Sequence, residues 1–469
     1  MAVGLKKIGL NKWQVERLPQ MRAEVIVFAK EAMIPQLQED LSLSQLQESA
    51  MLPQVISPVV GLPDIHQGFG LPIGGVMATE GLISVGAVGM DINCGVRLLV
   101  SNLEYHPRLF NQKTLQTLIR KIEREIPIGL GGKRQGRIPG LTLNEVVVRG
   151  AEALVRKGFG VRNDLESIEE GGKLEGASFE ALTDRAKKRG EKQVGTLGSG
   201  NHFIEIQKIE KVFDPQLAKA WGLFENQIGV MIHCGSRGLG HQTCLDYTDL
   251  FWRLKEKYRI SVPRKGLAAL PLETPEGTAY FGAMAAAVNF AFANRQFIEY
   301  QIQGVFNRFF KNKARLKIVY DVAHNIAKWE PLGGKQALIH RKGATRALPA
   351  GHSKNPKRYK KTGHPAIIPG SMGTSSFVLV GLPGASETYF SVNHGAGRAM
   401  SRREAKEKIS QEEFEKQMGE IVYNKPFQVI ADEAPGAYKD INLVIDTLVE
   451  SKIAKKVVQL TPLAVIKGS

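Results

Sequence analysis

The chain has 469 residues, 43% of them hydrophobic and 23% charged, which is a globular composition and excludes a disordered chain. At roughly 150 residues per domain, this length allows one large domain or two to three smaller ones. Lysine and arginine outnumber aspartate and glutamate by 63 to 46, a net charge of +17. That excess favours a polyanionic partner, nucleic acid first, although a solvated basic surface would explain it equally well.

The first half of the chain alternates between helical and strand patterns. Residues 21–48 have the spacing of one amphipathic helix. Residues 55–100 break into short apolar runs separated by glycine and proline, which indicates strands and turns. Helical periodicity returns at residues 115–126 and 179–190.

The most apolar helical stretch spans residues 283–306. Asn289, Asn294, Arg295 and Glu299 interrupt it, so it is too polar to span a membrane and is typical of a buried, alanine-rich helix. The first 19 residues contain no apolar stretch of the kind that a secretory signal needs. Three cysteines are too few for a disulfide framework and favour a reducing compartment. We therefore expect a cytoplasmic protein with no membrane partner.

The second half of the chain repeats one arrangement four times: a histidine stands where an apolar, strand-like run meets glycine or asparagine. These histidines are His202, His233, His324 and His394. A single histidine in this setting is more often structural than functional. Because strand ends in a mixed sheet converge on one face, four of them favour a shared site.

Asp91 and Cys94 lie three residues apart in a glycine-rich segment. Aspartate, cysteine and several histidines are common ligands of transition metals, but these two residues alone are better explained by a buried free cysteine. We expect Cys244 to pack inside a helix and Cys234 to point away from His233, as alternation along a strand requires. The chain has no HExxH, paired CxxC or GxxxxGK[ST] motif.

Two glycine-rich segments could cradle a phosphate. Residues 394–398 follow a strand and are expected to open a helix running towards Ile409, whose N-terminus would favour negative charge. Residues 369–376 supply further N–H and hydroxyl donors. Either segment alone could be only a turn. Together with His394 they suggest a histidine nucleophile that attacks a nucleotide phosphate.

Seven motifs occur along the chain in the order found in a known family. They lie at residues 64–70, 91–97, 198–203, 233–241, 323–325, 369–373 and 394–398. In these motifs the sequence resembles the RtcB family of RNA-splicing ligases over essentially its whole length. The resemblance implies an α+β fold with mixed and antiparallel sheets around a central metal cleft and flanking helices. It also implies one large, interleaved catalytic domain over residues 1–469, with no internal boundary.

The resemblance implies a GTP- and Mn²⁺-dependent RNA ligase. Such an enzyme joins an RNA 3′-phosphate or 2′,3′-cyclic phosphate to a 5′-hydroxyl, in tRNA splicing, in RNA repair or in both. His394 would attack the α-phosphorus of GTP to form a guanylylated histidine, with Asp64 orienting its ring, and the GMP would pass to the RNA 3′-phosphate. RNA is therefore the expected partner, and an archease-type activator is a further one.

By the same resemblance, two manganese ions would share one thiolate. One ion would be held by Asp91, Cys94 and His202, and the other by Cys94, His233 and His324. These ligand types do not themselves select manganese over zinc, so the identity of the metal depends on the resemblance.

The resemblance also assigns the guanylate contacts. They are Asn201, His202, Phe203, Ile204, Glu205, His324, Asn325, Pro369, Gly370, Ser371, Met372, Ser376, His394, Gly395, Ala396, Gly397 and Lys467. Glu205 would accept both edge N–H groups of guanine and Lys467 would reach O6. Tyr438 would stack on the base, unless it is only a core aromatic.

The RNA phosphates are expected to meet three arginines, Arg237, Arg398 and Arg402, because guanidinium groups match phosphate geometry. The basic loop 354–361 either extends this track or is a solvated loop.

Two other functions would use parts of the same constellation. A two-metal phosphoesterase or nuclease would need the metal ligands but not His394 or a guanine pocket. A non-catalytic RNA-binding paralogue could lose the ligands without harm, yet all of them are present. The intact motifs favour the ligase.

Overall fold

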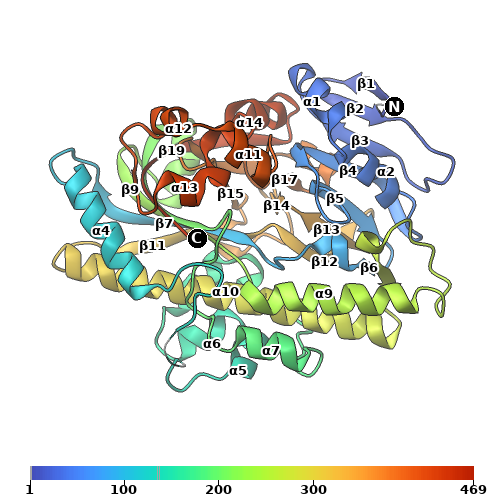
Figure 1. The fold of residues 1–469 in the computed structure, drawn as a ribbon, viewed down its shortest axis with the longest axis horizontal. Coiled ribbons are helices and arrows are strands. Elements are labelled where there is room, and N and C mark those ends of the chain that lie inside the picture. The colour runs from blue at the N-terminus through green and yellow to red at the C-terminus, as the bar shows by residue number, and fades with distance from the viewer. Residues whose placement is uncertain (1–2, 135, 137, 469) are drawn as a thin grey trace.

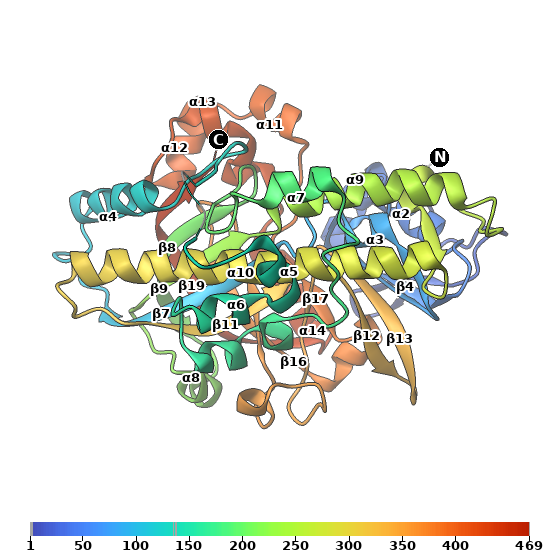
Figure 2. The same cartoon turned by 90° about the horizontal axis from the view of Figure 1, so that it is seen from below.

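The computed structural model describes residues 3–134, 136 and 138–468 (Figure 1). Residues 1, 2, 135, 137 and 469 of the expected single unit lie outside this description. Two large sheets organise the molecule, with helices on their outer faces (Figures 1 and 2). Strand neighbours are antiparallel except for the pairs β3–β4 and β18–β19. The α+β prediction, with mixed and antiparallel sheets, is confirmed.

The first sheet has seven strands. In spatial order they are β1 (Leu5–Gly9), β2 (Lys12–Val15), β3 (Val25–Phe28), β4 (Val55–His66), β5 (Ile73–Thr79), β13 (Lys335–Lys342) and β12 (Asn325–Leu332). Two short pairs stand apart from it: β6 (Leu82–Ser84) with β10 (Ala269–Pro271), and β14 (Ala344–Arg346) with β17 (Ser391–Asn393).

The second sheet contains the strands that include or adjoin three of the four predicted site histidines, His202, His233 and His324. Its order is β11 (Leu316–Ala323), β7 (Gly95–Glu104), β9 (Gln227–Cys234), β8 (Phe203–Val212), β19 (Ala454–Lys467), β16 (Ser376–Gly381) and β15 (Pro365–Ile368), with β18 (Val422–Tyr423) beside β19. Residues far apart in the sequence are therefore next to one another in this sheet.

The helices are distributed along the whole chain. They are α1 (Ile34–Glu39), α2 (Ser42–Ser49), α3 (Val85–Val88), α4 (Gln112–Glu125), α5 (Leu143–Arg149), α6 (Ala151–Arg156), α7 (Asp184–Gly190), α8 (Pro215–Trp221), α9 (Arg237–Leu254), α10 (Pro275–Phe309), α11 (Arg402–Lys408), α12 (Gln411–Met418), α13 (Phe427–Ile430) and α14 (Ile441–Glu450). Short 3₁₀ helices span Glu31–Met33, Arg162–Ser167, Glu169–Gly172, Lys265–Leu267, Lys357–Tyr359, Pro383–Thr388, Ala431–Glu433 and Pro435–Ala437.

Helix α10 is the longest helix of the described chain, with 35 residues, and runs along the long axis of the molecule beside α9 (Figures 1 and 2). Thr274 caps its first turn, accepting a hydrogen bond from the Gly277 N–H, and Pro275 occupies the first position, where no N–H is needed. Its central residues are buried, which confirms the predicted alanine-rich core helix. Within the described residues, no helix is both long and apolar enough to cross a membrane.

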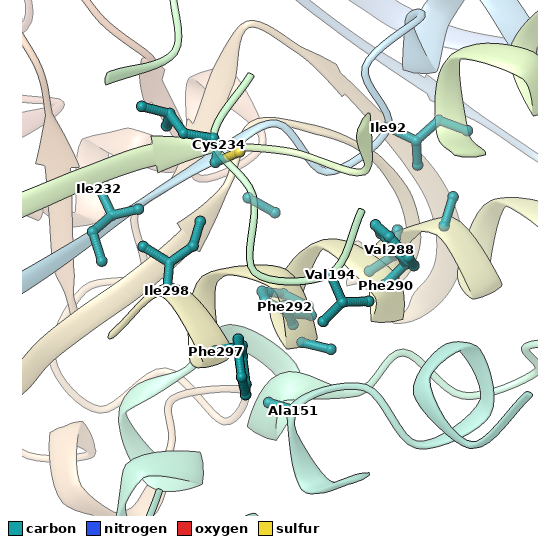
Figure 3. Close-up of a cluster of buried hydrophobic side chains, with 14 of the residues drawn as sticks. Ile92, Ala151, Val194, Ile232, Cys234, Val288, Phe290, Phe292, Phe297 and Ile298 are labelled. Atoms are coloured by element: carbon teal, nitrogen blue, oxygen red, sulfur yellow. The ribbon is translucent and has the colours of Figure 1, made fainter. Parts of the chain in front are cut away.

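One face of the second sheet packs on α10. Ile232 and Cys234 of β9 lie in a cluster with Val288, Phe292 and Ile298 of the helix (Figure 3). Because side chains alternate along a strand, His233 between them points to the opposite face. Cys234 therefore points away from His233, as expected.

Buried charges connect this sheet to α10. Asp321 on β11 accepts a hydrogen bond from Arg97 Nε at 2.8 Å and another from Arg295 Nε at 2.9 Å, and all three side chains are fully buried. Glu299 on α10 forms a second ion pair with Arg97. Charges at this depth are stable only when each is paired and hydrogen-bonded.

The predicted helix over residues 21–48 is wrong in its first part. Val25–Phe28 is strand β3, which pairs with β2 and β4 and is buried on both faces. Its apolar run fits a central strand as well as a helix face, so periodicity does not separate the two. The helical part begins only with the 3₁₀ helix Glu31–Met33, which leads into α1, where Pro35 stands in the first turn. Helix α7 likewise begins at Asp184, later than predicted, after the capping residue Thr183.

The Asp321 carboxylate should stabilise the folded protein much more than an exposed carboxylate does. Asp321→Ala leaves Arg97 and Arg295 buried without this carboxylate, and we expect the free energy of unfolding to fall by about 3–5 kcal/mol. Asp446→Ala removes only a half-exposed partner of Lys456 and should cost under about 1 kcal/mol. Chemical denaturation of both variants measures the difference, and equal losses would contradict the role given to Asp321.

Candidate metal and nucleotide site

The topology of the second sheet brings the predicted ligand residues together. Cys94 precedes β7, His202 precedes β8, His233 is near the end of β9, and His324 follows β11. In the antiparallel order β11-β7-β9-β8, the starts of β7 and β8 lie at the same edge as the ends of β9 and β11. The register shows this directly, since Gly95 pairs with both Ala323 and Cys234, and Phe203 pairs with His233.

The donor atoms of these residues face one another. Cys94 Sγ lies 3.2 Å from His233 Nε2 and 3.4 Å from His202 Nε2. His202 Nε2 is 2.8 Å from Asp91 Oδ2, and His233 Nε2 is 3.2 Å from His324 Nε2. Two sets of donors result, Asp91–Cys94–His202 and Cys94–His233–His324, each with all its donor atoms within 4.8 Å of one another. Cys94 belongs to both sets.

The chemistry of these donors fits metal ions. Burial, together with the neighbouring histidines, lowers the pKa of His233 and of His324 well below the usual value, so both rings are neutral and can offer a lone pair. Burial and the Asp91 carboxylate raise the pKa of Cys94 to about 12. The thiol therefore keeps its proton until a cation displaces it. Each set has three protein ligands, which leaves coordination positions for a substrate.

Arg295 links the segments that carry three of these ligands. Its Nη1 donates to the carbonyl of Asn93 at 3.0 Å and to that of Cys234 at 2.7 Å, while its Nε binds Asp321. A Cβ on Gly95 would lie 3.0 Å from Arg295 Nη2 and 2.2 Å from the Val322 carbonyl oxygen. Only glycine therefore admits this close approach. The guanidinium sets the positions of the backbone beside Cys94 and His233, and of the strand that leads to His324.

His394 approaches from the other side, out of the loop after β17. Its Nδ1 lies 2.6 Å from Asp64 Oδ2, and the same oxygen accepts the His394 backbone N–H at 3.0 Å. Asp64 lies on β4 and is fully buried. A carboxylate at Nδ1 favours the tautomer with the proton there, which leaves the lone pair on Nε2. The His394 ring centroid is 5.1 Å from that of His324.

The prediction that residues 394–398 open a helix is wrong. Helix α11 begins at Arg402, after Ser401, whose side chain accepts a hydrogen bond from the Glu404 N–H. Gly397 adopts φ +74°, and a Cβ there would lie 2.2 Å from the carbonyl oxygen of Asp64. The glycine is needed for this close contact between the His394 loop and β4.

Two cavities meet at His394. The larger, of about 290 Å³, is close to the lower end of ligand sites and contains most of the predicted guanylate contacts. These are Asn201, Phe203, Pro369, Gly370, Ser371, Met372, His394, Gly395, Ala396, Gly397 and Lys467. The smaller, of about 240 Å³, is lined by residues that include Asp91, Cys94, His324, Asn325 and His394. We refer to them as the nucleotide cavity and the metal-side cavity.

Four predicted guanylate contacts, His202, Ile204, Glu205 and Ser376, are not among the residues that line either cavity. Glu205 is buried behind the wall, where it accepts a hydrogen bond from Gln207 Nε2 at 2.6 Å, and burial raises its pKa to about 8. Its contact with guanine stays a prediction.

Glu433 is a lining residue that the motifs did not indicate. Its Oε2 lies 3.1 Å from Lys467 Nζ and accepts a hydrogen bond from the Tyr438 hydroxyl at 2.7 Å. Burial alone would raise its pKa, but Lys467 and Arg402 outweigh burial and lower it to about 2. Nothing in the local sequence distinguishes Glu433 from a surface carboxylate, because its partners come from distant segments.

The three arginines predicted to contact RNA lie in different settings. Arg237 is buried and donates to Thr196 Oγ1 at 3.2 Å and to the Gly129 carbonyl at 2.8 Å. Arg398 and Arg402 line the nucleotide cavity, and Arg402 is the more exposed of the two. Their contacts with RNA stay predictions.

The basic loop 354–361 does not line either of these cavities. It borders a separate cavity that Arg346, Lys354 and Lys357 help to form. Cys244 is buried in α9, as expected. Cys234 has one contact that alternation did not reveal, since its Sγ is 3.9 Å from Nδ1 of His202.

The structure thus places a thiol in two sets of possible metal donors, near a carboxylate-held histidine that lines both cavities. Comparison with known proteins identifies the family of the chain. A family model described as tRNA-splicing ligase RtcB matches residues 45–468, and the chain belongs to this family. The resemblance found from the motifs is thereby confirmed.

Similar proteins cover nearly the whole chain. The tRNA-splicing ligase RtcB of Thermococcus kodakarensis is 43% identical over 484 aligned positions, which cover 99% of each protein. That of Nanoarchaeum equitans is 43% identical over the full length of both chains. The RNA-splicing ligase RtcB of Mycobacterium tuberculosis is also 43% identical, over 90% of this chain and all of its own.

The shared thiol leads to a specific expectation about metal binding. Cys94→Ala removes a donor from both sets and should abolish binding of both ions, whereas His202→Ala and His324→Ala should each remove one. Cys244→Ala, a buried thiol in α9, is the matched control and should bind like the unmodified protein. Titration with Co²⁺, read by its sulfur-to-metal absorption band, and metal analysis after Mn²⁺ loading measure this. Full loading of Cys94→Ala would contradict the two-set arrangement.

Proposed function

We propose that this protein is an RNA ligase that joins a 3′-phosphate or 2′,3′-cyclic phosphate end to a 5′-hydroxyl end, using GTP and two manganese ions. The observation that carries the proposal is the position of His394, held by Asp64 between the nucleotide cavity and the metal-side cavity. The family to which the chain belongs supports RNA as the substrate, because its members carry the name RNA- or tRNA-splicing ligase.

The first step is the attack of His394 on GTP. Asp64 keeps the ring proton on Nδ1, so the Nε2 lone pair forms a bond to the α-phosphorus while the bond to pyrophosphate breaks. The Asp64 carboxylate balances the positive charge that the ring acquires. The product is a guanylylated His394, and pyrophosphate leaves with the electron pair.

The nucleotide cavity supplies the binding groups for this step. Gly395 and Gly370 bring backbone close to the ligand, and Lys467 offers a cation. Guanine presents two N–H donors beside a carbonyl, which adenine lacks. Glu433 and Lys467, 3.1 Å apart on the cavity wall, offer the complementary carboxylate and ammonium, the role that the family resemblance assigns to Glu205 with Lys467.

The second and third steps take place at the metal-side cavity. An oxygen of the RNA 3′-phosphate attacks the phosphorus of the GMP, and the bond to His394 Nε2 breaks. The RNA 5′-hydroxyl then attacks the activated 3′-phosphate, GMP leaves, and the hydroxyl proton passes to solvent. A cyclic phosphate must first be opened by water. When bound, the two ions would polarise the phosphate oxygens and stabilise the leaving oxygens.

A two-metal phosphoesterase is the main competing function. It would need the two donor sets but neither the Asp64–His394 pair nor a second cavity on the far side of that histidine. The 2.6 Å contact between Asp64 and His394 therefore favours the ligase.

Covalent labelling tests the proposed function. With α-³²P-GTP and Mn²⁺, we expect a labelled, acid-labile protein band that is absent with α-³²P-ATP and absent from His394→Ala. Asp64→Asn should still bind GTP but should label on the order of 100-fold more slowly, because the ring loses the carboxylate that orients it. His106→Ala, at an exposed histidine that lines neither cavity, is the control and should label normally.

Phosphate release without labelling would contradict the proposed function. A protein with its metal sites loaded that takes up no label from GTP, but releases phosphate from an RNA 3′-phosphate end, would establish the phosphoesterase and exclude the ligase. Joining of the two RNA ends on a denaturing gel distinguishes the products.

A further inference from the structure

An exposed aromatic side chain lies at the metal-side cavity. Phe69 lines this cavity together with Asp91, Cys94, His324 and His394, and the residue is 38% exposed. A single exposed hydrophobic residue is ordinary on a protein surface. What distinguishes Phe69 is that the backbone on both sides of it is tightly held.

Buried polar side chains fix the backbone on both sides of the ring. Gln45 is buried and binds Gly68 twice, accepting its N–H at 3.0 Å and donating to its carbonyl at 2.5 Å. The ammonium of Lys342, also buried, donates to the Phe69 carbonyl and to that of Gly86 at 3.0 Å. Burying a lysine in this way costs free energy, so these contacts indicate a segment held in one conformation.

The residue after Phe69 is held just as closely. Gly70 adopts φ +78°, and a Cβ at this position would lie 2.2 Å from the carbonyl oxygen of Gly266. The backbone therefore has little freedom, while the phenyl ring itself remains exposed at the cavity. A backbone held in one conformation lowers the entropy lost on binding, and an exposed aromatic ring offers a face on which a flat ligand can stack.

The size of the metal-side cavity limits what can sit beside the ring. At about 240 Å³ it is smaller than sites for whole organic ligands, and its donors suit a phosphate group. A phosphate bound there would leave the rest of its nucleotide at the rim. Phe69 is an exposed hydrophobic residue in the lining of this cavity, and the net charge of +17 favours binding of a nucleic acid strand to the protein.

We propose that the ring of Phe69 stacks on the base of the RNA nucleotide that carries the 3′-phosphate, while that phosphate occupies the metal-side cavity. This inference rests on the proposed function and names the contact that orients its RNA substrate. Stacking uses the face that all four bases share, so Phe69 requires a base but does not select its identity.

The test combines a change in the protein with a change in the RNA. Binding of a short, 5′-labelled RNA with a 3′-phosphate is measured by fluorescence anisotropy with Mn²⁺ and without GTP. We expect Phe69→Ala to weaken RNA binding roughly tenfold. An RNA whose last nucleotide lacks its base should bind the unmodified protein more weakly by about the same factor. With Phe69→Ala, the missing base should cause no further loss.

Three other variants separate stacking from other causes. Phe69→Trp should bind like the unmodified protein, whereas Phe69→Leu, which keeps an apolar side chain, should bind like Phe69→Ala. Phe224→Ala, a phenylalanine that is 39% exposed and lines neither cavity, should have no effect. Thermal unfolding confirms that each variant is folded.

The same variants distinguish failure of this inference from failure of the proposed function. We expect Phe69→Ala to be labelled by α-³²P-GTP at the normal rate and to join RNA with a raised KM. If the unmodified protein is not labelled by GTP and does not join RNA, both the proposed function and the stacking contact are overturned. If it does both, but Phe69→Ala binds RNA normally or still loses affinity when the base is missing, only the stacking contact is overturned.

Discussion

One buried guanidinium holds together the segments on which the site depends. Arg295, fully buried on α10, donates to the carbonyls of Asn93 and Cys234 and pairs with Asp321. These residues flank Cys94, His233 and the strand before His324. Arginine suits this position because its planar fork can satisfy several acceptors at fixed angles while remaining charged. The sheet brings the ligand residues to one edge, and Arg295 sets their relative positions.

The two sheets contribute different parts of the chemistry. The second sheet supplies the metal donors, whereas the first supplies Asp64, which orients His394 from the opposite side. The glycines at positions 95 and 397 permit the close backbone contacts through which the parts of the site come together. The result is a histidine nitrogen with a cavity on either side, one suited to a nucleotide and one suited to a phosphate beside metal ions. This arrangement supports guanylyl transfer to RNA better than simple hydrolysis.

Those features of the site that depend on neighbouring residues in the sequence could be predicted from it. His202 stands directly before a strand-like run, and His233, His324 and His394 stand where such runs end, so the shared site followed from strand termini meeting at one edge. Contacts between distant segments were not predictable in this way. Glu433 and Phe69 gain their importance only from what lies opposite them, and Val25–Phe28 is a strand because of its neighbours in the sheet. The loop after His394 is not helical because it must approach Asp64.

The most direct test of this account is Mn²⁺ binding by Arg295→Lys, compared with Arg341→Lys. Lysine keeps the charge for Asp321 but cannot reach both carbonyls, while Arg341 is an equally buried arginine paired with Glu330. The account predicts that both variants are less stable, and that only Arg295→Lys loses Mn²⁺ affinity, by about 10- to 100-fold. Unchanged affinity in folded Arg295→Lys would contradict it.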